Sequence, residues 1–419
     1  MIFKDIINSL IKVLNENAYL NITINNTLKS RDSVYTEHDK KLYVRVTSGV
    51  VENKILLDYM LRHLISGQRV KPFAKNALRV GAYMISFLNT PNHYVVNEIV
   101  KAVKKEDYRA STFINAILRK YIDNDIYNTS MEKINKLSED ERLSILYSID
   151  LDLVKLLTKQ YQDVESILKP SKVHTNTYRV NTLKISFDEI NAILKKDNIE
   201  YSLDGVTLIS KESLINHSLF NEGKIVAQDA SSIKVAEVAN PRKFDKVLDV
   251  CSAPGSKSMH LAALMNNTGE ITSCDIYEHK LKLIEDNAKK LGVTNVKTML
   301  SDGTTSKYDT CFDLVVADVP CSGLGVIGHK SDLKYNMTLA KIKEINDLQK
   351  KIINNVCNYV KVGGALVYST CTINKDENEN LINEFLCKHK EFRKVEEHVL
   401  VQNFNNNQDG FYICKLERI

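Results

Sequence analysis

Apolar positions in the first 125 residues recur at the spacing of an α-helix. They form runs at 2–14, 39–64, 72–87, 95–103 and 110–121, separated by turn residues such as Pro91. Within each run apolar side chains stand three or four positions apart, and the alternation typical of strands is missing. We therefore predict a helical domain of roughly five to seven helices over residues 1–125.

Two stretches of different character follow. Residues 126–170 are predicted to be a helical connector, polar over Ile122–Glu141 and helical over Leu143–Leu168. Residues 171–235 mix both periods. Strand candidates are H-T-N-T-Y-R-V-N-T-L and Gly205–Ile209, and Ser186–Lys196 is a helix that opens with a capping box. This pattern predicts a small α+β module.

From residue 236 to 419, strand and helix patterns alternate, which indicates a doubly wound parallel α/β sheet. The strand candidates are Val247–Val250, Glu270–Cys274, Val296–Leu300, Leu314–Ala317 and Ala365–Ser369. The helix candidates are Lys257–Leu264, Glu278–Leu291 and Leu339–Val360, the last of which is predicted to stop at Gly363-Gly364. The tail returns to strand character at Val399–Val401 and Phe411–Leu416.

Composition narrows the class of protein only slightly. The net charge of +5 is compatible with nucleic-acid contact. The first ten residues include Asp5 and polar breaks, unlike a signal peptide, and no apolar run is long enough to span a membrane, so a cytoplasmic protein is expected. The eight cysteines are expected to be free thiols, and none has zinc-ligand spacing, so no metal site is predicted. Basic residues scattered through the helical domain are interpreted as solvated faces.

Polar residues gather at the carboxyl ends of the predicted strands, where open α/β sheets bind ligands. Asp275 ends the second strand, and Asp302 follows the third. The first strand runs into a loop made of Cys251, Ser252, Ala253, Pro254, Gly255, Ser256 and Lys257. This loop matches neither the dinucleotide-binding nor the P-loop pattern. A nucleoside ligand that contacts acids through its ribose and base fits better, and S-adenosylmethionine is such a ligand.

Two cysteines near adjacent strand ends indicate that the methyl acceptor is carbon 5 of a pyrimidine. Asp318 and Cys321 follow the fourth strand, and Cys371 follows the fifth. Carbon 5 of a pyrimidine becomes nucleophilic once a thiolate adds to carbon 6, and an acid near the ring assists. The spacing allows these three residues to be acid, base and nucleophile without deciding which thiol attacks. Methylation of an exocyclic amine needs no thiol, and D-V-P-C differs from the loop usual for that reaction.

Three motifs resemble those of RNA cytosine-5 methyltransferases of the Sun/NOL/NOP type. They are V-L-D-V-C-S-A-P-G-S-K-S, D-V-P-C-S-G-L-G-V-I and Y-S-T-C-T-I-N-K-D-E-N-E. The front half resembles a NusB-like domain through R-V-G-A-Y-M-I-S-F-L, P-N-H-Y-V-V-N-E-I-V and F-I-N-A-I-L-R-K-Y, with Y-R-V-N-T-L and V-A-Q-D-A-S-S between the two parts. That pairing is similar to bacterial members that act on 16S rRNA, either free or in an early small-subunit particle.

The resemblance implies roles for matching residues. Cys371 would attack carbon 6, Cys321 would assist proton removal and enzyme release, and Asp318 would bind the target base beside the methyl donor. The loop 251–257 with Asp275 and Asp302 would hold S-adenosylmethionine. The helical domain would dock rRNA, the 171–235 module would adapt the RNA to a Rossmann-like catalytic domain, and the chain would be a monomer.

The sequence departs from the family pattern in two places. Ser256 replaces the second glycine of the first loop, and we predict that it begins the helix and avoids a left-handed backbone. After the Pro-Cys loop, the stretch 328–332 replaces the usual Arg and His-Pro-Asp.

Two alternative functions stay open: the same chemistry on tRNA or another RNA, and a non-catalytic RNA-binding or antitermination factor. Two thiols beside an acid argue against the latter.

Overall fold

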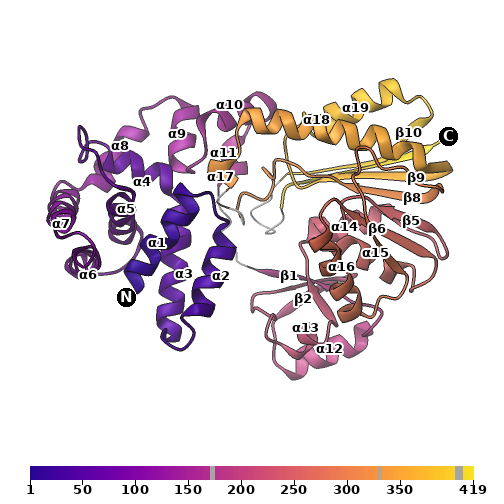
Figure 1. Cartoon of the computed structure of the whole chain (residues 1–419), viewed down its shortest axis with the longest axis horizontal. Helices are drawn as coiled ribbons and strands as arrows, with labels where there is room; N and C mark the ends of the chain where they lie inside the picture. Colours follow the sequence, from indigo (N-terminus) through magenta and orange to yellow (C-terminus); the bar gives the residue numbers. More distant parts are fainter. Residues whose placement is uncertain (170–174, 329–330, 332, 402–408) are drawn as a thin grey trace. The chain divides into compact units, whose positions relative to one another are not determined.

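The computed structural model describes residues 1–169, 175–328, 331, 333–401 and 409–419 (Figure 1). His329, Lys330 and Asp332, three of the residues that depart from the family pattern, lie outside this range. The chain divides into two compact units. The helical unit contains residues 1–169 and 327–339, and the α/β unit contains the rest. No helix among the described residues is long and apolar enough to cross a membrane.

Seven helices form the first part of the helical unit, within the predicted range of five to seven, although the second of them lies outside the predicted apolar runs. They are α1 (Ile2–Asn15), α2 (Leu20–Ser30), α3 (Glu37–Glu52), α4 (Lys54–Leu61), α5 (Pro72–Phe87), α6 (Asn92–Lys104) and α7 (Tyr108–Asp123). Their apolar faces meet in one core, which includes Ile6, Val50 and Leu118. The run predicted over 39–64 is two helices, because the chain turns at Asn53 between α3 and α4.

The connector also belongs to the helical unit. It contains α8 (Ile126–Ile134), α9 (Glu139–Leu146), α10 (Leu151–Gln160) and α11 (Val164–Leu168). Helix α8 lies within the stretch predicted to be polar, and it forms because Ile126 and Ile134 pack on the helical core. Segment 327–339 with α17 (Leu333–Asn336) also groups here, although the prediction placed it within a domain of 236–419. The Tyr335 hydroxyl donates to the Val51 carbonyl oxygen at 2.5 Å.

The α/β unit begins with the predicted small module. Its antiparallel sheet has the order β2 (Tyr201–Asp204), β3 (Thr207–Ser210), β1 (Asn176–Val180) and β4 (Ile225–Ala227). Helix α12 (Phe187–Lys196) and the short α13 (Ser218–Asn221) complete it. The predicted capping box is confirmed: Ser186 N–H donates to Glu189 Oε2 at 2.9 Å, and the Ser186 hydroxyl accepts from Glu189 N–H at 3.3 Å.

The larger sheet has the order β10-β11-β9-β8-β5-β6-β7. Its strands are β5 (Lys246–Asp249), β6 (Glu270–Asp275), β7 (Val296–Leu300), β8 (Phe312–Asp318), β9 (Val360–Thr370), β10 (Phe392–Leu400) and β11 (Phe411–Arg418). Strands β5 to β9 are parallel, as predicted, but β11 pairs antiparallel with both β9 and β10, so the sheet is mixed. The α/β doubly wound fold class is otherwise confirmed.

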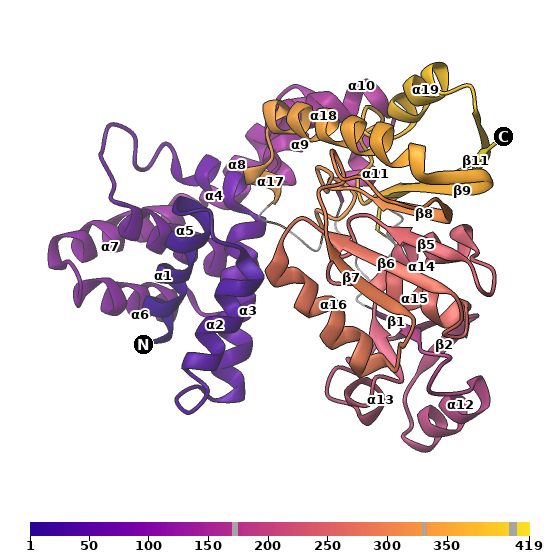
Figure 2. The same ribbon diagram turned by 45° about the vertical axis from the view of Figure 1, so that its right-hand side comes forward.

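Helices cover both faces of this sheet (Figures 1 and 2). Helices α14 (Ala230–Ala239), α15 (Ser256–Leu264) and α16 (Glu278–Leu291) pack on one face, and α18 (Leu339–Val356) and α19 (Glu379–Lys388) on the other. The prediction that the long helix reaches Val360 and stops at Gly363-Gly364 is wrong. Helix α18 ends at Val356, and both glycines lie inside β9 beside a register shift against β8. A β-carbon on Gly364 would lie 2.9 Å from the Asp313 carbonyl oxygen.

Candidate active site

The first strand of the larger sheet, β5, leads into the loop 251–257, which turns sharply before α15. The turn is at Gly255, whose φ of 98° is left-handed and suits glycine. A β-carbon there would also lie 3.3 Å from Cγ2 of Ile284. Ser256 is the first residue of α15 and is not among the residues with positive φ. The prediction for Ser256 is therefore confirmed, and the serine requires no strained backbone.

Lys257 extends from this loop to the end of β8. Its Nζ donates to Oδ2 of Asp318 at 2.5 Å, and the Ser369 hydroxyl donates to Oδ1 at 2.8 Å. Burial by itself would lower the pKa of Lys257, but attraction to Asp318, together with Asp249 and Cys371, outweighs burial and leaves that pKa raised. Asp318 and Ser369 are register partners in the parallel pair β8–β9. The carboxylate is thus fixed in orientation by a cation and a hydroxyl group.

The two cysteines at the ends of β8 and β9 lie against each other. The Sγ atoms of Cys321 and Cys371 are 3.2 Å apart. The hydrogen bond to Cys371, together with burial, raises the pKa of Cys321 well above its usual value. The structure therefore brings together both thiols that the sequence places near adjacent strand ends, with Asp318 three residues before Cys321.

A buried carboxylate that the sequence reasoning missed joins the two cysteine loops. Glu377 is fully buried, and its oxygens accept from Ser322 N–H at 2.8 Å, Gln349 Nε2 at 3.0 Å and Asn374 Nδ2 at 3.0 Å. Ser322 directly follows Cys321, and Asn374 comes three residues after Cys371. The only signal in the sequence for Glu377 is the run N-K-D-E-N-E that follows the second cysteine.

The predicted ribose and base acids also lie at neighbouring strand ends, those of β6 and β7. Asp275 is 7% exposed, and its Oδ1 accepts from Tyr277 N–H at 3.0 Å. Asp302 Oδ1 accepts from the N–H and hydroxyl of Thr304 at 2.9 and 2.7 Å. Both acids therefore cap the turns that follow them while standing at the edge where the loop 251–257 also begins.

Two further groups near β5 are held in apolar surroundings. Burial raises the pKa of Cys251, so its thiolate is disfavoured. Asp249, which the sequence reasoning treated only as part of a strand, is fully buried, and Ser258 Oγ donates to its Oδ2 at 2.5 Å. Burial raises the pKa of Asp249 to about 7. Ser252 fixes the loop itself, since its N–H and hydroxyl both donate to the Cys274 carbonyl oxygen.

These elements enclose a cavity of about 250 Å³. Its walls include every residue of the loop 251–257 except Gly255, together with Asp318. It is also lined by Ala227, Gln228, Asp229 and Ser232, from the end of β4 to the first turn of α14. Lys257 and Asp318 line this cavity, whereas Cys321, Cys371 and Glu377 are not among its lining residues. We refer to these five residues together as the catalytic rim. The rim combines an oriented carboxylate, a buried cation and two thiols, which are the groups needed to hold a polar heterocycle and add a sulfur atom to it.

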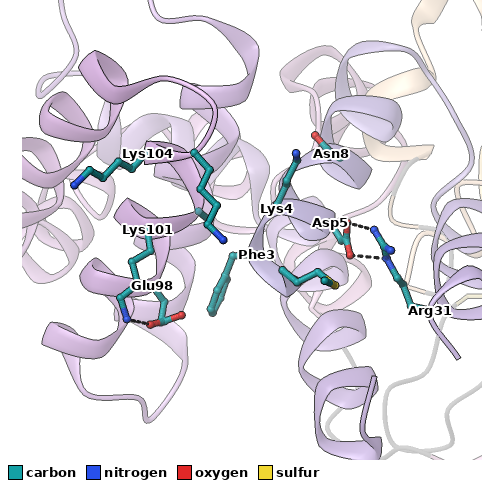
Figure 3. A pocket seen from close by; sticks show the side chains of 11 residues that line it. Phe3, Lys4, Asp5, Asn8, Arg31, Glu98, Lys101 and Lys104 are labelled. Atoms are coloured by element: carbon teal, nitrogen blue, oxygen red, sulfur yellow. Dashed lines mark hydrogen bonds and ion pairs between the residues drawn. The ribbon is translucent and has the colours of Figure 1, made fainter. Parts of the chain in front are cut away.

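A second cavity, of about 840 Å³, lies within the helical unit between α1 and α6 (Figure 3). We call it the lysine groove, after its lining residues Lys4, Lys101, Lys104 and Lys105. The cations here are mostly held in pairs: Lys4 with Glu106, Lys101 with Glu98 at 2.6 Å, and Arg31 with Asp5 at 2.9 Å. Phe3 supplies an apolar wall.

The fold and the rim define an α/β methyltransferase joined to a NusB-type helical domain. Residues 236–417 match the family described as 16S rRNA methyltransferase RsmB/F, and residues 4–123 match the NusB family. A relative described as a probable ribosomal RNA small subunit methyltransferase B is 30% identical over 98% of this chain, so the chain belongs to the ribosomal RNA small subunit methyltransferase B family.

Two curated relatives and one solved structure span almost the whole chain. It is 30% identical to the probable ribosomal RNA small subunit methyltransferase B of Bacillus subtilis, over 98% of this chain and 97% of that one. It is 28% identical to the protein of the same description from Synechocystis, over 96% of both. The crystal structure of PH0851 has the same fold, with a TM-score of 0.80, 24% identity and 99% coverage of both chains.

Proposed function

We propose that this chain methylates carbon 5 of a cytidine in 16S rRNA, with S-adenosylmethionine as methyl donor, through a covalent cysteine–cytosine intermediate. The observation that carries the proposal is the pair of thiols 3.2 Å apart beside the oriented carboxylate of Asp318. Methylation of an exocyclic amine would need no thiol, whereas carbon 5 of cytosine needs a sulfur nucleophile at carbon 6.

The residues present fit the methyl donor. Carboxylates at the ends of neighbouring parallel strands can accept hydrogen bonds from ribose hydroxyls and a purine amine, and this supports assigning Asp275 and Asp302 to the methyl donor. The donor, when bound, supplies an electrophilic methyl group. S-adenosylmethionine carries no phosphate, so no glycine-rich phosphate cradle is required, which agrees with the loop sequence.

The protein groups divide the acid–base work. Cys371 loses its proton to solvent and adds as a thiolate to carbon 6. Asp318 accepts from the amine edge of the base, and the Lys257 ammonium paired with it offsets the negative charge that moves into the ring. Cys321 keeps its proton more firmly than a free thiol, and the ammonium of Lys257 interacts electrostatically with Cys371. Both effects favour Cys371 as the thiolate. Once the Cys371 sulfur is bonded to carbon 6, the hydrogen bond that most raises the pKa of Cys321 is lost. Cys321 can then release its proton to solvent and take up the carbon 5 proton after methyl transfer. The Cys371 thiolate leaves as the ring double bond re-forms.

The helical unit is proposed to dock the rRNA. The lysine groove offers exposed ammonium groups, and Lys101 is 70% exposed even while paired with Glu98. Lysine contacts to phosphate give affinity without sequence reading.

The test combines two variants and a map of the product. Cys371→Ala should abolish methylation while methyl-donor binding persists, and Cys321→Ala should accumulate a covalent RNA adduct that survives denaturing electrophoresis. An adduct trapped only in Cys371→Ala would reverse the two cysteines. Bisulfite sequencing of rRNA and tRNA, with and without the gene, locates the modified base. A missing 5-methylcytidine in tRNA alone would overturn the rRNA assignment.

A further inference from the structure

The stretch V-A-Q-D-A-S-S at 226–232 of the small module has no role in the proposed mechanism, yet four of its residues line the active-site cavity. Gln228 and Ser232 line the same 250 Å³ space as Lys257 and Asp318. Gln228 is 7% exposed, so its side chain is packed in place. The cavity is near the lower end of the volumes of small-ligand pockets, about 300 Å³.

The orientation of the Gln228 amide is determined by a buried arginine. Arg179, on β1, is 1% exposed, and its Nε donates to Gln228 Oε1 at 2.9 Å. A guanidinium can only donate, so the amide oxygen must face Arg179 and the amide nitrogen must face the other way. Gln228 Nε2 lies 3.4 Å from Ser232 Oγ, its one hydrogen-bond partner among the described residues.

Burying the Arg179 guanidinium is energetically unfavourable, and its hydrogen bond to the Gln228 amide does not by itself offset that cost. Its two terminal nitrogens have no hydrogen-bond partner among the described residues, and burial lowers its pKa to about 10. A buried cation without a carboxylate is unfavourable for folding. The arrangement has one clear consequence, which is that an N–H donor is fixed on the wall of the cavity that also holds the carboxylate of Asp318.

We propose that Gln228 is a specificity-determining residue that donates from Nε2 to the ring carbonyl oxygen of the target pyrimidine, and that Arg179 is the positioning residue that fixes this donor. The inference rests on the proposed function. A cytosine presents a carbonyl oxygen at carbon 2 and an amine at carbon 4, so a donor and a carboxylate in one cavity match its two ends. The carboxylate of the methyl donor has the same acceptor chemistry, and the test separates the two ligands.

Gln228→Glu is the decisive variant, because it keeps the shape and the acceptor for Arg179 but removes the N–H donor. We expect thermal stability to be maintained or raised, since a carboxylate now faces the guanidinium. For an in vitro transcript of 16S rRNA, kcat/KM should fall about 10- to 100-fold, the effect of leaving a buried acceptor unpaired. The Kd of S-adenosylhomocysteine, measured by calorimetry, should change less than about twofold. Gln68→Glu, an exposed position in the helical unit, is the charge-matched control.

Each other result overturns the base assignment. If the Kd for S-adenosylhomocysteine rises about tenfold while the KM for RNA is unchanged, Gln228 binds the carboxylate of the methyl donor instead. If both constants match the wild type, Gln228 only satisfies Arg179. Should Gln228→Glu fail to fold, Ser232→Ala tests the same wall and should raise the KM for RNA.

The positioning role of Arg179 has its own readout. Arg179→Met should reduce kcat/KM for RNA, and Arg179→Lys, which keeps a donor for Gln228 Oε1, should recover most of that loss. Failure of the inference differs from failure of the proposed function: in the first case the wild-type chain still produces 5-methylcytidine, and in the second it does not.

Discussion

The catalytic rim and the lysine groove both concentrate charge, but they hold it in different ways. Asp318 and Glu377 of the rim each accept from two or three donors and are buried or partly buried. In the groove, Lys4 and Lys101 each bind one carboxylate at the surface. A group that does chemistry must be fixed before the substrate arrives, whereas a group that binds phosphate must be free to exchange partners.

Asp318→Asn should give the largest effect. It tests whether the catalytic rim depends on a carboxylate that is held in place before the substrate binds. The change leaves the Lys257 ammonium, whose side chain is 14% exposed, without its carboxylate. We expect methyl transfer to fall by about 10³-fold, in the range for a lost acid–base group, and stability to fall by about 3 kcal/mol, as for a broken buried ion pair. Single-turnover assays and urea unfolding measure the two effects.

The control lies at the other end of the same strand. Asp313 pairs with Lys361 at 2.6 Å, but both side chains are a third exposed or more. Asp313→Asn should cost at most about 1 kcal/mol and leave methyl transfer unchanged. Equal losses of activity in the two variants would show that Asp318 acts only through the stability of β8.

Glu377→Gln should give the next largest effect. One of its two oxygens becomes an NH₂ group that must face a donor, either Asn374 Nδ2 or the pair Ser322 N–H and Gln349 Nε2. We expect a loss of about 2 kcal/mol in stability, typical of hydrogen bonds to a buried charge, and slower adduct formation because the two cysteine loops separate. Adduct formation is followed in the Cys321→Ala background.

Glu379→Gln provides the matched control two residues further along the chain. Burial raises the pKa of Glu379, so neutralising that side chain should be harmless or slightly stabilising. If both variants behave alike, the segment tolerates any loss of charge, and Glu377 does not hold the loops together.

The proposal that the lysine groove binds RNA through exchangeable surface cations is tested by replacing Lys101, Lys104 and Lys105 together with alanine. Binding of an rRNA fragment should weaken about tenfold at about 0.1 M salt, and the slope of log K against log salt should fall by up to about 2 to 3, since three phosphate contacts are lost. The rate at saturating RNA should not change, because the catalytic rim is untouched. Filter binding over a salt series measures the slope.

Replacing Lys120, Lys133 and Lys136 with alanine removes the same charge from exposed positions of the helical unit outside the groove. This triple variant should bind RNA almost as well as the wild type. If it lost as much affinity as the groove variant, binding would depend on net charge alone, and the lysine groove would not be a docking surface.

The sequence predicts the rim better than it predicts what surrounds it. The acids and thiols could be placed because the ends of parallel strands share one edge, so Asp318 and Cys371 follow from strand order alone. Glu377 could not be placed, since its partners come from three segments that meet only in the folded chain. Likewise, Arg179 and Gln228 are 49 residues apart and meet through the pairing of β1 with β4.

Long helices and strands were also predicted unequally well. Apolar spacing gave Glu278–Leu291 correctly, because periodicity decides an isolated amphipathic helix. It extended the helix from Leu339 too far, because the apolar residues after Val356 continue the pattern into the start of β9. Most of β10 was missed, since it is an edge strand with exposed polar residues on both faces.

Ser256→Gly should give the smallest effect. It restores the glycine that the family usually has in the loop 251–257. Positive φ is at Gly255, and Ser256 is already helical, so restoring the glycine removes no strain. We expect the Kd of S-adenosylhomocysteine to stay within about twofold and stability to fall by less than about 1 kcal/mol, the cost of glycine in a helix. Gly255→Ala is the contrast: its left-handed backbone and the nearby Ile284 side chain should make it cost about 1 to 2 kcal/mol or more. Calorimetry and thermal unfolding measure both variants. A clear gain in stability or affinity for Ser256→Gly would mean that Ser256, and not Gly255, carries the backbone restriction of the loop.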